Sequence, residues 1–429
     1  MKKIDILTRV EGEGRIWIEI DNGKIKDVIL NIFEAPRFIE GILKGKDFSV
    51  IPDITARICG ICPVAYQISS VQAVEDAFDV AVSQETERLR RIFYHGEWIQ
   101  SHAIHVFFLH LPDFFGKSSI FEIAKENREL FLDGLKIKEA GSKIIEKIGG
   151  RVSHPVSVVA GGFTKYPEKG ELEELIPEIE NALERAVYWI EKFSQLNFPS
   201  DDMGDIHFVS LQEEEYPILK GEIVSNKGLK VTKEEFKELF TEFQVSYSTA
   251  KKCRIRGKEI YVVGAVSRFN NSFEKLSEIA VKTAKKIGLH PPVKNSFKTL
   301  LIRMIEIVHS LEKSIQLIKN YKKPSENSKI TVKKSSGTGV SEAPRGILWH
   351  RYSFDEKGRI LEADIVPPTS QNQDIMEENV KNHLKKVKNK DIDYLTSEAE
   401  KIIRNYDPCI SCATHFLKID KNLKSCKIF

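Results

Sequence analysis

Residues 407–415 read DPCISCATH, lie close to the end of a 429-residue chain, and largely determine which fold that chain can adopt. A second stretch of the same kind, RICGIC, occupies residues 57–62. Each stretch holds a Cys-x-x-Cys pair, which places two sulfurs on one turn where they can bind a metal or close a disulfide. Together the two pairs supply four thiolates, and nearly the whole chain lies between them.

Three kinds of site use four cysteines. A structural zinc site takes four sulfurs and leaves no open position, but a zinc ribbon usually has both pairs within a few tens of residues. Two disulfides are expected chiefly in secreted chains, with the proteins of hyperthermophiles as an exception. A catalytic site for a soft metal is the third kind. The spacing alone leaves all three open.

Five short stretches resemble motifs of one family, the large subunit of nickel-iron hydrogenases. The two cysteine stretches are similar to its two signature motifs. Three more match in the expected order, namely TRVEG at residues 8–12, EAPRG at residues 342–346 and VPPT at residues 366–369. The resemblance covers almost the full chain. It implies an enzyme that cleaves H2 heterolytically and reversibly, into protons and electrons, at a nickel-iron centre.

The expected fold is α+β and mainly helical, a hydrogenase large-subunit fold in a single domain over residues 1–429. Residues 4–33 alternate apolar and polar side chains around a DNG turn, which predicts an N-terminal β-hairpin. Strand-like runs predict a β-rich insertion at residues 201–264, and a polar loop at residues 322–339 precedes a second predicted hairpin at residues 347–366. Helical periodicity predicts helices within residues 64–78, 85–111, 118–198, 272–321, 373–387 and 394–406.

The composition is that of a globular protein without an obvious polyanion or lipid partner. Apolar residues make up 41% of the chain, charged residues 30%, and the net charge is only +3. This balance gives no support to nucleic-acid or membrane-surface binding. No run of about 18 uncharged apolar residues and no signal-peptide pattern is present. We therefore expect a cytoplasmic protein with no membrane span and no nucleic-acid partner.

The resemblance implies how the four cysteines bind metal. Cys59 and Cys409 match terminal nickel ligands. Cys62 and Cys412 match ligands that bridge nickel to an iron carrying carbon monoxide and two cyanides. Soft sulfur donors suit nickel and low-spin iron better than oxygen ligands do.

A second, hard cation is also implied by the resemblance. Magnesium or another iron would bind near the mature C-terminus, with ligands from Glu40, Ile365 and His415. In the family, the chain is cut after the histidine of the last motif. Residues 416–429 are therefore expected to be a propeptide, which would carry Cys426 away.

The same resemblance assigns proton transfer. The candidate bases for the proton released from H2 are the Cys409 thiolate and Arg345, and Glu11 is the expected next carrier. Asp113 and Asp407 are expected to orient Arg345.

Two positions place side chains over the iron ligands, and two others depart from the family. Arg345 matches an arginine that hydrogen-bonds one cyanide, while Thr369, after Pro368, faces the other cyanide. The family often has a histidine where this chain has Glu13, which leaves the proton path after Glu11 open. The family commonly has a second histidine at the position of Tyr66 in this chain. We expect Tyr66 to make a polar contact to the Cys62 sulfur without transferring a proton.

Four histidines share the predicted helix at residues 85–111 with many aromatic side chains. His102 and His105 are three residues apart and face the same side. We expect all four, His95, His102, His105 and His110, to be core histidines with satisfied ring nitrogens rather than metal ligands.

The cysteine count implies a partner. Beyond the four predicted ligands only Cys253 and Cys426 remain, too few for an iron-sulfur cluster. Electrons must then leave through an iron-sulfur small subunit, with further electron-transfer subunits of flavin and NAD(P) or deazaflavin type. Maturation factors and a C-terminal processing protease are implied as well.

The motif details resemble the cytoplasmic NAD(P)-linked and sulfhydrogenase group, in which sulfur or polysulfide also accepts electrons. Deazaflavin-reducing and heterodisulfide-reductase-linked hydrogenases are the close alternatives. The non-enzyme alternatives are a zinc-stabilised scaffold and a respiratory-complex subunit, which metal content separates from a hydrogenase.

Overall fold

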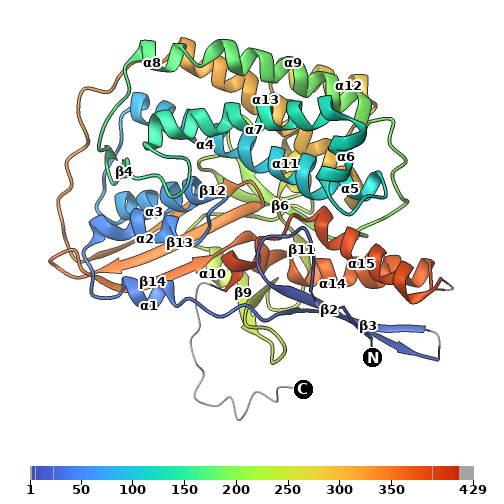
Figure 1. Cartoon of the computed structure of the whole chain (residues 1–429). Helices are drawn as coiled ribbons and strands as arrows, with labels where there is room; N and C mark the ends of the chain where they lie inside the picture. The colour runs from blue at the N-terminus through green and yellow to red at the C-terminus, as the bar shows by residue number, and fades with distance from the viewer. Residues whose placement is uncertain (1, 5, 23, 389, 415–429) are drawn as a thin grey trace.

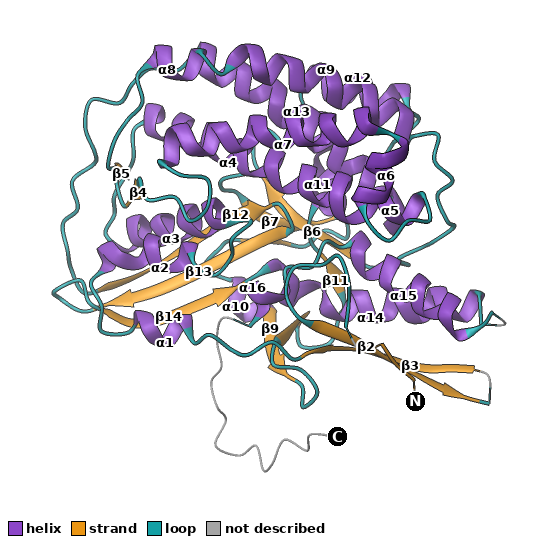
Figure 2. Cartoon of the chain, in the orientation of Figure 1, coloured by secondary structure: helices purple, strands orange, loops and turns teal. Residues whose placement is uncertain are grey.

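Helices form most of the molecule, as the sequence predicts, and small sheets lie beside them (Figures 1 and 2). The computed structural model describes residues 2–4, 6–22, 24–388 and 390–414. The α-helices are α1 (Ile39–Leu43), α2 (Ile51–Ala56), α3 (Pro63–Ala77), α4 (Gln84–Ala103), α5 (Leu111–Phe114), α6 (Ile120–Glu126), α7 (Arg128–Gly149), α8 (Lys169–Glu173), α9 (Ile176–Phe193), α10 (Phe236–Leu239), α11 (Ala265–Ser272), α12 (Glu278–Lys286), α13 (Thr299–Lys319), α14 (Pro368–Lys386), α15 (Ile392–Asn405) and α16 (Ile410–Ala413). Tighter or wider turns are η1 (Phe48–Val50), η2 (Ile104–His110), η3 (Phe273–Lys275) and η4 (Ser296–Lys298), of which η2 is a π-helix.

The strands form several small sheets. They are β1 (Lys2–Ile4), β2 (Gly14–Asp21), β3 (Lys24–Ile32), β4 (Val158–Val159), β5 (Gly162–Phe163), β6 (His207–Gln212), β7 (Glu222–Ser225), β8 (Lys230–Val231), β9 (Phe240–Gln244), β10 (Lys251–Ile255), β11 (Tyr261–Val262), β12 (Ser335–Ala343), β13 (Gly346–Phe354) and β14 (Ile360–Val366). The strand orders are β1-β2-β3, β4-β5, β11-β6-β7-β8, β10-β9 and β12-β13-β14. Every described pair is antiparallel except β11 with β6.

The predicted N-terminal hairpin is confirmed. Strands β2 and β3 pair from Gly14 opposite Ile32 to Asp21 opposite Lys24. Alternate residues of β2, including Ile16, are buried, because successive side chains of a strand point to opposite faces. The tip of the hairpin projects from the body of the molecule at the lower right of Figure 1.

Four long helices, α4, α7, α9 and α13, lie above the β12-β13-β14 sheet in Figure 1. Helices α4 and α7 approach closely at Gly96 and Gly141, where a Cβ on Gly141 would lie 2.5 Å from the Gly96 carbonyl oxygen. The predicted helix over residues 85–111 differs from a regular α-helix because α4 gives way to η2. A π-helix aligns residues five apart, and the rings of His105 and His110 accordingly lie 4.9 Å from each other.

The predicted loop at residues 322–339 is wrong at its end, because β12 begins within it. Gly337 and Gly339, which suggest turns in the sequence, instead allow the strand to touch the backbone of α3. A Cβ would lie 2.2 Å from the Ala77 nitrogen at the first position and 2.1 Å from the Ser69 oxygen at the second. Glycine in a strand often marks such a close approach.

Residues 201–264 hold β6 to β11 and the short helix α10, in agreement with the predicted β-rich character. Part of this segment forms a small core of its own against β13. Phe236 stacks on Trp349 with ring centroids 5.2 Å apart, and Val209 and Ile223 are buried in the same cluster. The segment therefore supports the underside of the sheet that carries residues 342–346.

The two ends of the chain meet. The Ile410 nitrogen donates to the Glu11 carbonyl oxygen at 3.0 Å, and Glu11 forms a parallel bridge with Cys409. Arg37 joins the same region, because its guanidinium donates to the Ile58 carbonyl at 2.7 Å and also to the Ser411 carbonyl. Both cysteine stretches are thus held in one place.

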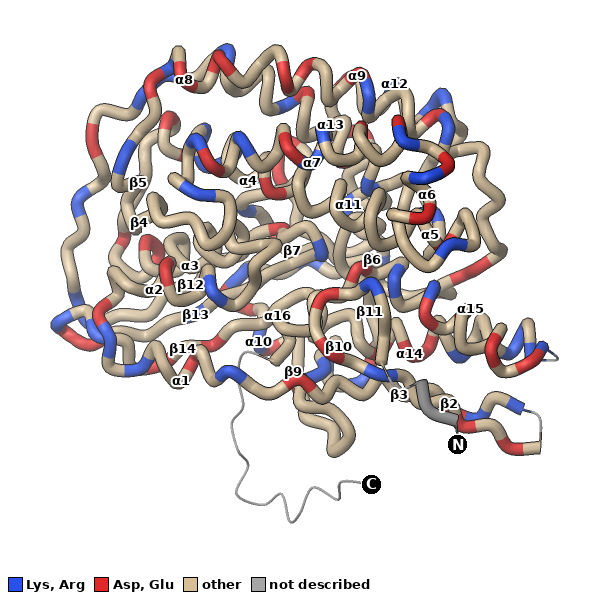
Figure 3. Tube along the Cα trace, in the orientation of Figure 1, with Lys and Arg blue, Asp and Glu red and all other residues tan. Residues whose placement is uncertain are grey.

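Charge is spread over the molecule without a large region of one sign in the view of Figure 3, where Lys and Arg alternate with Asp and Glu along most elements. This distribution agrees with the small net charge of +3. Among the described residues, none of the helices combines the length and the apolar character that a membrane span requires.

Candidate metal centre

The four predicted cysteine ligands come together in the interior. The sulfurs of Cys59, Cys62, Cys409 and Cys412 all lie within 4.8 Å of one another. Cys59 Sγ is 3.3 Å from Cys409 Sγ, and Cys62 Sγ is 3.8 Å from Cys412 Sγ. All four side chains are at most 3% exposed. No disulfide joins the described cysteines, so four thiols are available to bind metal.

Local structure sets each pair. After α2, the backbone nitrogens of Ile61 and Cys62 point at Cys59 Sγ at 3.4 and 3.3 Å, which closes the first turn around that sulfur. At the other end, the Cys409 nitrogen donates to Thr369 Oγ1 at 3.0 Å. Pro368 opens α14 and so places Thr369 in the first turn of that helix.

Crowding of the thiols perturbs their acidity. Burial raises the pKa of Cys59, but hydrogen bonds from the thiols of Cys409, Cys412 and Cys62 outweigh burial and leave its pKa well below the usual value. Burial raises the pKa of Cys409 and Cys412. A soft metal ion is a suitable occupant, because it binds deprotonated sulfur and replaces the shared protons. The donor set therefore fits a nickel-iron centre.

One side of the sulfur cluster, here called the closed side, is formed by Arg345 and Asp407. Arg345 Nε donates to the Asp407 carbonyl oxygen at 2.7 Å, and Nη2 donates to Asp407 Oδ1 at 3.0 Å. The two side chains are 4% and 3% exposed. Burial opposes the charge of Arg345, but Asp407 and then the cysteines hold its pKa well above the usual value. A fixed positive charge thus faces the sulfurs.

A second guanidinium holds the backbone next to Arg345. Arg268 donates to both oxygens of Glu306 at 2.7 and 2.8 Å and to Glu342 Oε2 at 2.8 Å. It also donates to the carbonyl oxygens of Ala343 and Pro344, each at 3.0 Å. The arginine is fully buried. Residues 342–344 are therefore clamped directly before Arg345.

Asp113 differs from the prediction that it orients Arg345. Its carboxylate accepts from Arg404 Nε at 2.7 Å and Nη2 at 2.9 Å, and from Arg9 Nη2 at 2.5 Å. Among the described carboxylates, Asp407 alone forms an ion pair with Arg345, whose Nη1 also donates to the Ser101 hydroxyl at 3.4 Å. The reason is geometric: Asp113 lies in α5, after η2, where the end of α15 presents Arg404. Asp113 instead ties α5 to the helix that leads into residues 407–415.

The other side of the cluster, here called the open side, runs from Glu11 toward the surface. The Ser411 nitrogen donates to Glu11 Oε2 at 3.0 Å, and the Ser411 hydroxyl donates to Glu34 Oε2 at 3.0 Å. Glu34 also accepts from the Glu13 nitrogen at 3.2 Å. Glu11, Ser411 and Glu34 are half-buried, and the Glu13 side chain is exposed. A series of polar groups thus joins the interior to solvent.

Burial raises the pKa of Glu11, and the neighbouring Cys59 raises it further. Hydrogen bonds with Ser411 and Cys409 act in the opposite direction. A carboxyl group whose pKa is shifted upward is a more effective proton carrier near neutral pH than an ordinary one.

The predicted second cation site is only partly within the described residues. Glu40 Oε1 accepts from the Ile365 nitrogen at 2.8 Å. Burial, followed by the charge of Asp364, raises the pKa of Glu40 to about 8. His415 and residues 416–429 lie outside the described part of the chain. A buried carboxylate with a raised pKa fits a cation site, because a bound cation would favour its ionised form.

The helix histidines are buried core residues, as expected, but the expectation that all their ring nitrogens are satisfied is wrong. The Nδ1 atoms of His102, His105 and His110 have no hydrogen-bond partner among the described residues. His102 Nε2 lies 2.8 Å from Glu306, and His95 Nδ1 lies 3.3 Å from the Ser310 hydroxyl. His105 Nε2 contacts the Arg404 carbonyl oxygen, and His110 Nε2 contacts Asn405 Oδ1, at 2.7 and 2.8 Å. The last two contacts anchor the end of α15, just before Asp407.

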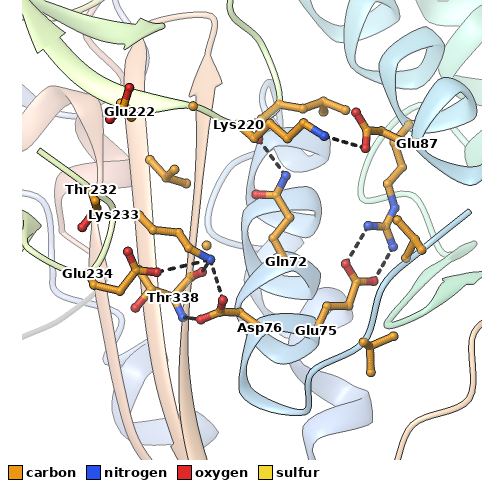
Figure 4. A pocket seen from close by; sticks show the side chains of 17 residues that line it. Gln72, Glu75, Asp76, Glu87, Lys220, Glu222, Thr232, Lys233, Glu234 and Thr338 are labelled. Carbon is orange, nitrogen blue, oxygen red and sulfur yellow. Dashed lines mark hydrogen bonds and ion pairs between the residues drawn. The ribbon is translucent and has the colours of Figure 1, made fainter. Parts of the chain in front are cut away.

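A surface cavity of about 470 Å³ beside α3 offers a different kind of lining (Figure 4). Its lysines are paired with acids of the same wall: Lys233 Nζ contacts Asp76 Oδ1 at 2.7 Å, and Lys220 Nζ contacts Glu87 Oε2 at 2.8 Å. Deeper in, Arg90 is paired with Glu75. None of the predicted site residues lines this cavity.

Ser411, Glu34 and Arg268 organise the site, although none of them is predicted as a site residue from the sequence. Ser411 lies inside a motif, and its position between two cysteines is a signal that could have drawn attention to it. Glu34 and Arg268 carry no such signal, because their partners are remote in sequence. Only the folded chain brings them to the site.

Comparisons with known proteins agree with this geometry. A family model described as nickel-dependent hydrogenase matches residues 37–130 and 220–415. The alpha subunit of sulfhydrogenase 1 from Pyrococcus furiosus is 34% identical over 97% of this chain and 98% of its own. The F420-non-reducing hydrogenase vhc of Methanococcus voltae has a subunit that is 30% identical over 96% of this chain and 94% of its own. The crystal structure of an NAD+-reducing [NiFe]-hydrogenase in the H2-reduced state superposes with a TM-score of 0.86 at 25% identity, covering 96% of this chain and 99% of that one.

The geometry of the site and the comparisons indicate the same family. Four buried thiols suited to soft metals lie where the two signature stretches meet. The fold matches a nickel-iron hydrogenase over nearly its whole length. This chain therefore belongs to the nickel-dependent hydrogenase family, as a catalytic large subunit with a four-cysteine nickel-iron site.

Proposed function

We propose that this chain reversibly converts H2 into two protons and two electrons and passes the electrons to an iron-sulfur small subunit. The observation that carries the proposal is the cluster of four sulfurs within 4.8 Å of one another, between a buried arginine and a half-buried glutamate. A zinc scaffold would need the sulfurs but would have no use for Arg345 and Glu11 beside them.

In this proposal Cys59 and Cys409 would bind nickel alone, and Cys62 and Cys412 would bind nickel and also the iron that carries carbon monoxide and two cyanides. When bound, the metals supply a Lewis acid that polarises H2, a molecule without a handle for ordinary side chains. The chain contributes the four sulfurs and the burial that keeps water away from them.

The released proton leaves through the open side. Cys409 receives it first, and Glu11 takes it next. Arg345 stays protonated, because its pKa is held well above the usual value, and it contributes charge and not a base. Ser411 and Glu34 continue the path, which replaces the histidine that this chain lacks at Glu13. The Ser411 backbone amide holds the Glu11 carboxylate and the Ser411 hydroxyl holds that of Glu34, so the two carboxylates lie on either side of this serine, which supports the route. The raised pKa of Glu11 suits a group that gains and loses a proton in each turnover.

The closed side positions charge. Asp407 holds Arg345 beside the sulfurs, where the guanidinium would hydrogen-bond one cyanide of the iron. Thr369, placed by Pro368, would face the other cyanide while its hydroxyl oxygen accepts from the Cys409 nitrogen at 3.0 Å.

Magnesium or a second iron would bind to Glu40, to the Ile365 carbonyl oxygen and to His415. Removal of residues 416–429 by a processing protease, after maturation factors have delivered the metals, would leave His415 at the C-terminus. The pKa of about 8 for Glu40 supports this assignment. Burial and Asp364 disfavour the ionised carboxylate, and a bound cation would stabilise it.

For the electron acceptor we favour NAD(P) or sulfur, reached through further subunits, in the cytoplasm. The full-length likeness to the alpha subunit of a sulfhydrogenase, and to an NAD+-reducing hydrogenase, supports this choice. A role linked to heterodisulfide reductase or to a deazaflavin is the second candidate. Of these two, the similarity to a hydrogenase named as F420-non-reducing favours the link to heterodisulfide reductase.

The proposal is tested by following H2 oxidation with the purified complex, first with an artificial viologen dye and then with NAD+, NADP+, polysulfide and a deazaflavin in parallel. We expect dye reduction in every active preparation and reduction of NAD(P)+ or polysulfide at a comparable rate. Reduction of the dye, but of neither NAD(P)+ nor polysulfide, would favour the second candidate, and reduction of the deazaflavin would then identify which of its two forms applies. A fully loaded complex that reduces no dye under H2 would contradict hydrogenase function.

A further inference from the structure

Tyr66 is a buried tyrosine beside the sulfur cluster whose hydroxyl group lacks a hydrogen-bond partner within the described part of the chain. It lies one turn into α3, which starts directly after Cys62, and its side chain is 1% exposed. The phenol oxygen is fully buried, yet none of the described residues hydrogen-bonds it. A buried hydroxyl group without a partner destabilises the folded chain, so its retention calls for a reason.

The other buried tyrosines of the described chain show that this is unusual for the fold. Each of them has a partner for its hydroxyl, and these pairs are Tyr94 with Ser341, Tyr216 with Glu306, Tyr261 with Gln371, Tyr321 with the Pro167 carbonyl, Tyr352 with His350 and Tyr406 with Asn379. Tyr66 is the exception, and it is also the one next to the sulfurs.

Three of the cysteines act on the Tyr66 hydroxyl. After burial, the groups that raise its pKa are Cys412, Cys62 and Cys409, and the Cys412 side chain is within hydrogen-bonding reach. The ring lies 5.7 Å from that of His350, in a tilted contact that fixes its direction. A phenol has an ordinary pKa of about 10 and therefore keeps its proton at neutral pH. The protonated phenol can donate a hydrogen bond to a neighbouring sulfur.

Sulfur is a weak acceptor as a thiol, but a sulfur bound to a metal is deprotonated and accepts more strongly. Hydrogen bonds to ligand sulfurs draw electron density away from the metals and thereby tune them. We propose that the Tyr66 hydroxyl donates a hydrogen bond to the Cys412 sulfur of the metal-loaded site and sets the electron density there. The inference rests on the proposed function, and it differs from the sequence-based expectation of a contact to Cys62.

The role is one of tuning a ligand and does not include proton transfer. Since the phenol holds its proton, turnover does not require Tyr66 to ionise. Removing the hydroxyl should leave metal binding and folding intact, because it would orphan no polar partner among the described residues. The electronic signature of the metals should change, and this separates the proposal from a purely structural role.

The test is an infrared measurement on the purified complex in the cyanide and carbonyl stretching region, for the unchanged chain and for Tyr66→Phe. With the hydrogen bond gone, more electron density reaches the iron, so we expect the carbonyl band to move several wavenumbers lower at unchanged nickel and iron content. The matched control is Tyr321→Phe, which removes a buried hydroxyl far from the sulfurs and should leave the bands in place.

A second change reverses the sign. Replacing Tyr66 alone with 3-fluorotyrosine keeps the ring and strengthens the phenol as a donor, so the carbonyl band should move to higher frequency. It also serves if Tyr66→Phe fails to load metal. Bands that coincide with those of the unchanged chain in the loaded variants would overturn the inference. An unchanged chain without nickel or without these bands would instead overturn the proposed function, and this inference would fail with it.

Discussion

The closed side and the open side of the sulfur cluster are built on different principles. On the closed side, Arg345 and Asp407 are buried and paired with each other, and Arg268 clamps the backbone before them. On the open side, Glu11 and Glu34 are half-buried and connected through one serine. The closed side can hold charge in one place, and the open side can pass a proton to solvent.

This contrast shows how a single site divides two tasks. A buried charged pair is costly to assemble and strongly destabilised when one partner is lost, so it tolerates little motion. A half-buried carboxyl has water nearby and can change its protonation at small cost. Changes on the closed side should therefore affect stability and rate together, whereas changes on the open side should affect rate alone.

The largest effect is expected from Glu11→Gln on the open side. The amide keeps the shape and the hydrogen bond from Ser411 but cannot carry a proton, so H2 oxidation should fall by about 10³-fold, within the range for loss of general acid–base catalysis. The melting temperature and infrared bands should stay the same. Glu13→Gln, two residues along with an exposed side chain, is the control. Near-normal turnover of Glu11→Gln would remove the open side as the proton route.

Arg345→Lys on the closed side should lower turnover by about 10²-fold, because an ammonium group cannot match the forked contacts of guanidinium with Asp407. Unlike Glu11→Gln, it should also lower the melting temperature, since part of a buried pair is lost. Kinetics and calorimetry on the same preparation measure both. Arg185→Lys, in a remote ion pair with Asp133, serves as the control. A loss of rate with unchanged stability would contradict the distinction between the two sides.

Glu34→Gln tests the outer part of the open side. Because water reaches this group and can substitute for it, we expect a decrease of only about threefold to tenfold, smaller than that of Glu11→Gln. Ser411→Ala breaks the same connection one step earlier and should give a similar decrease. The solvent isotope effect on H2 oxidation should rise in both variants. Equal effects of Glu34→Gln and Glu11→Gln would mean that the route has no alternative exit.

The smallest expected effect is a pH dependence of the melting temperature that comes from His383, a residue remote from the cysteines. His383 lies between Glu398 at 2.9 Å and Asp201 at 3.8 Å. Burial opposes its charge, but Asp201 and Glu398 raise its pKa from 6.5 to about 9. The protonated form is thus favoured by folding.

This contribution to stability should be complete below pH 6.5 and disappear as the pH rises through about 9. Asp201 also accepts a hydrogen bond from Ser296, and the Ser296 hydroxyl accepts one from Asn405, two residues before Asp407. Loss of the His383 charge should therefore also weaken the packing next to the closed side. Melting temperatures across this range should decline in the unchanged chain and decline less in His383→Gln. The same slope in both would show that His383 does not contribute.

Much of the site could be predicted because its residues lie in short stretches with chemical meaning. The pairs Cys59 with Cys62 and Cys409 with Cys412 indicate a site by spacing alone, and residues around the DNG turn indicate the hairpin. Arg345 and Glu11 are recognisable only through their motifs. In each case local sequence carries the information, so the prediction needs no knowledge of distant contacts.

The remaining features depend on contacts between parts of the chain far apart in sequence. Arg268 is identified by partners at Glu306 and Glu342, and Asp113 pairs with Arg404 instead of Arg345. The glycine at position 337 looks like a turn residue until α3 is seen against it. No periodicity or spacing encodes such tertiary contacts, which explains why these features had to come from the fold.

Elemental analysis combined with infrared spectroscopy, on the complex purified after co-production with maturation factors, tests whether the four sulfurs hold nickel and iron. We predict nickel in equal amount to this chain and sharp bands in the cyanide and carbonyl region, both lost in Cys409→Ala. Zinc in place of nickel, with no bands in that region, would contradict a nickel-iron site and leave a four-cysteine scaffold.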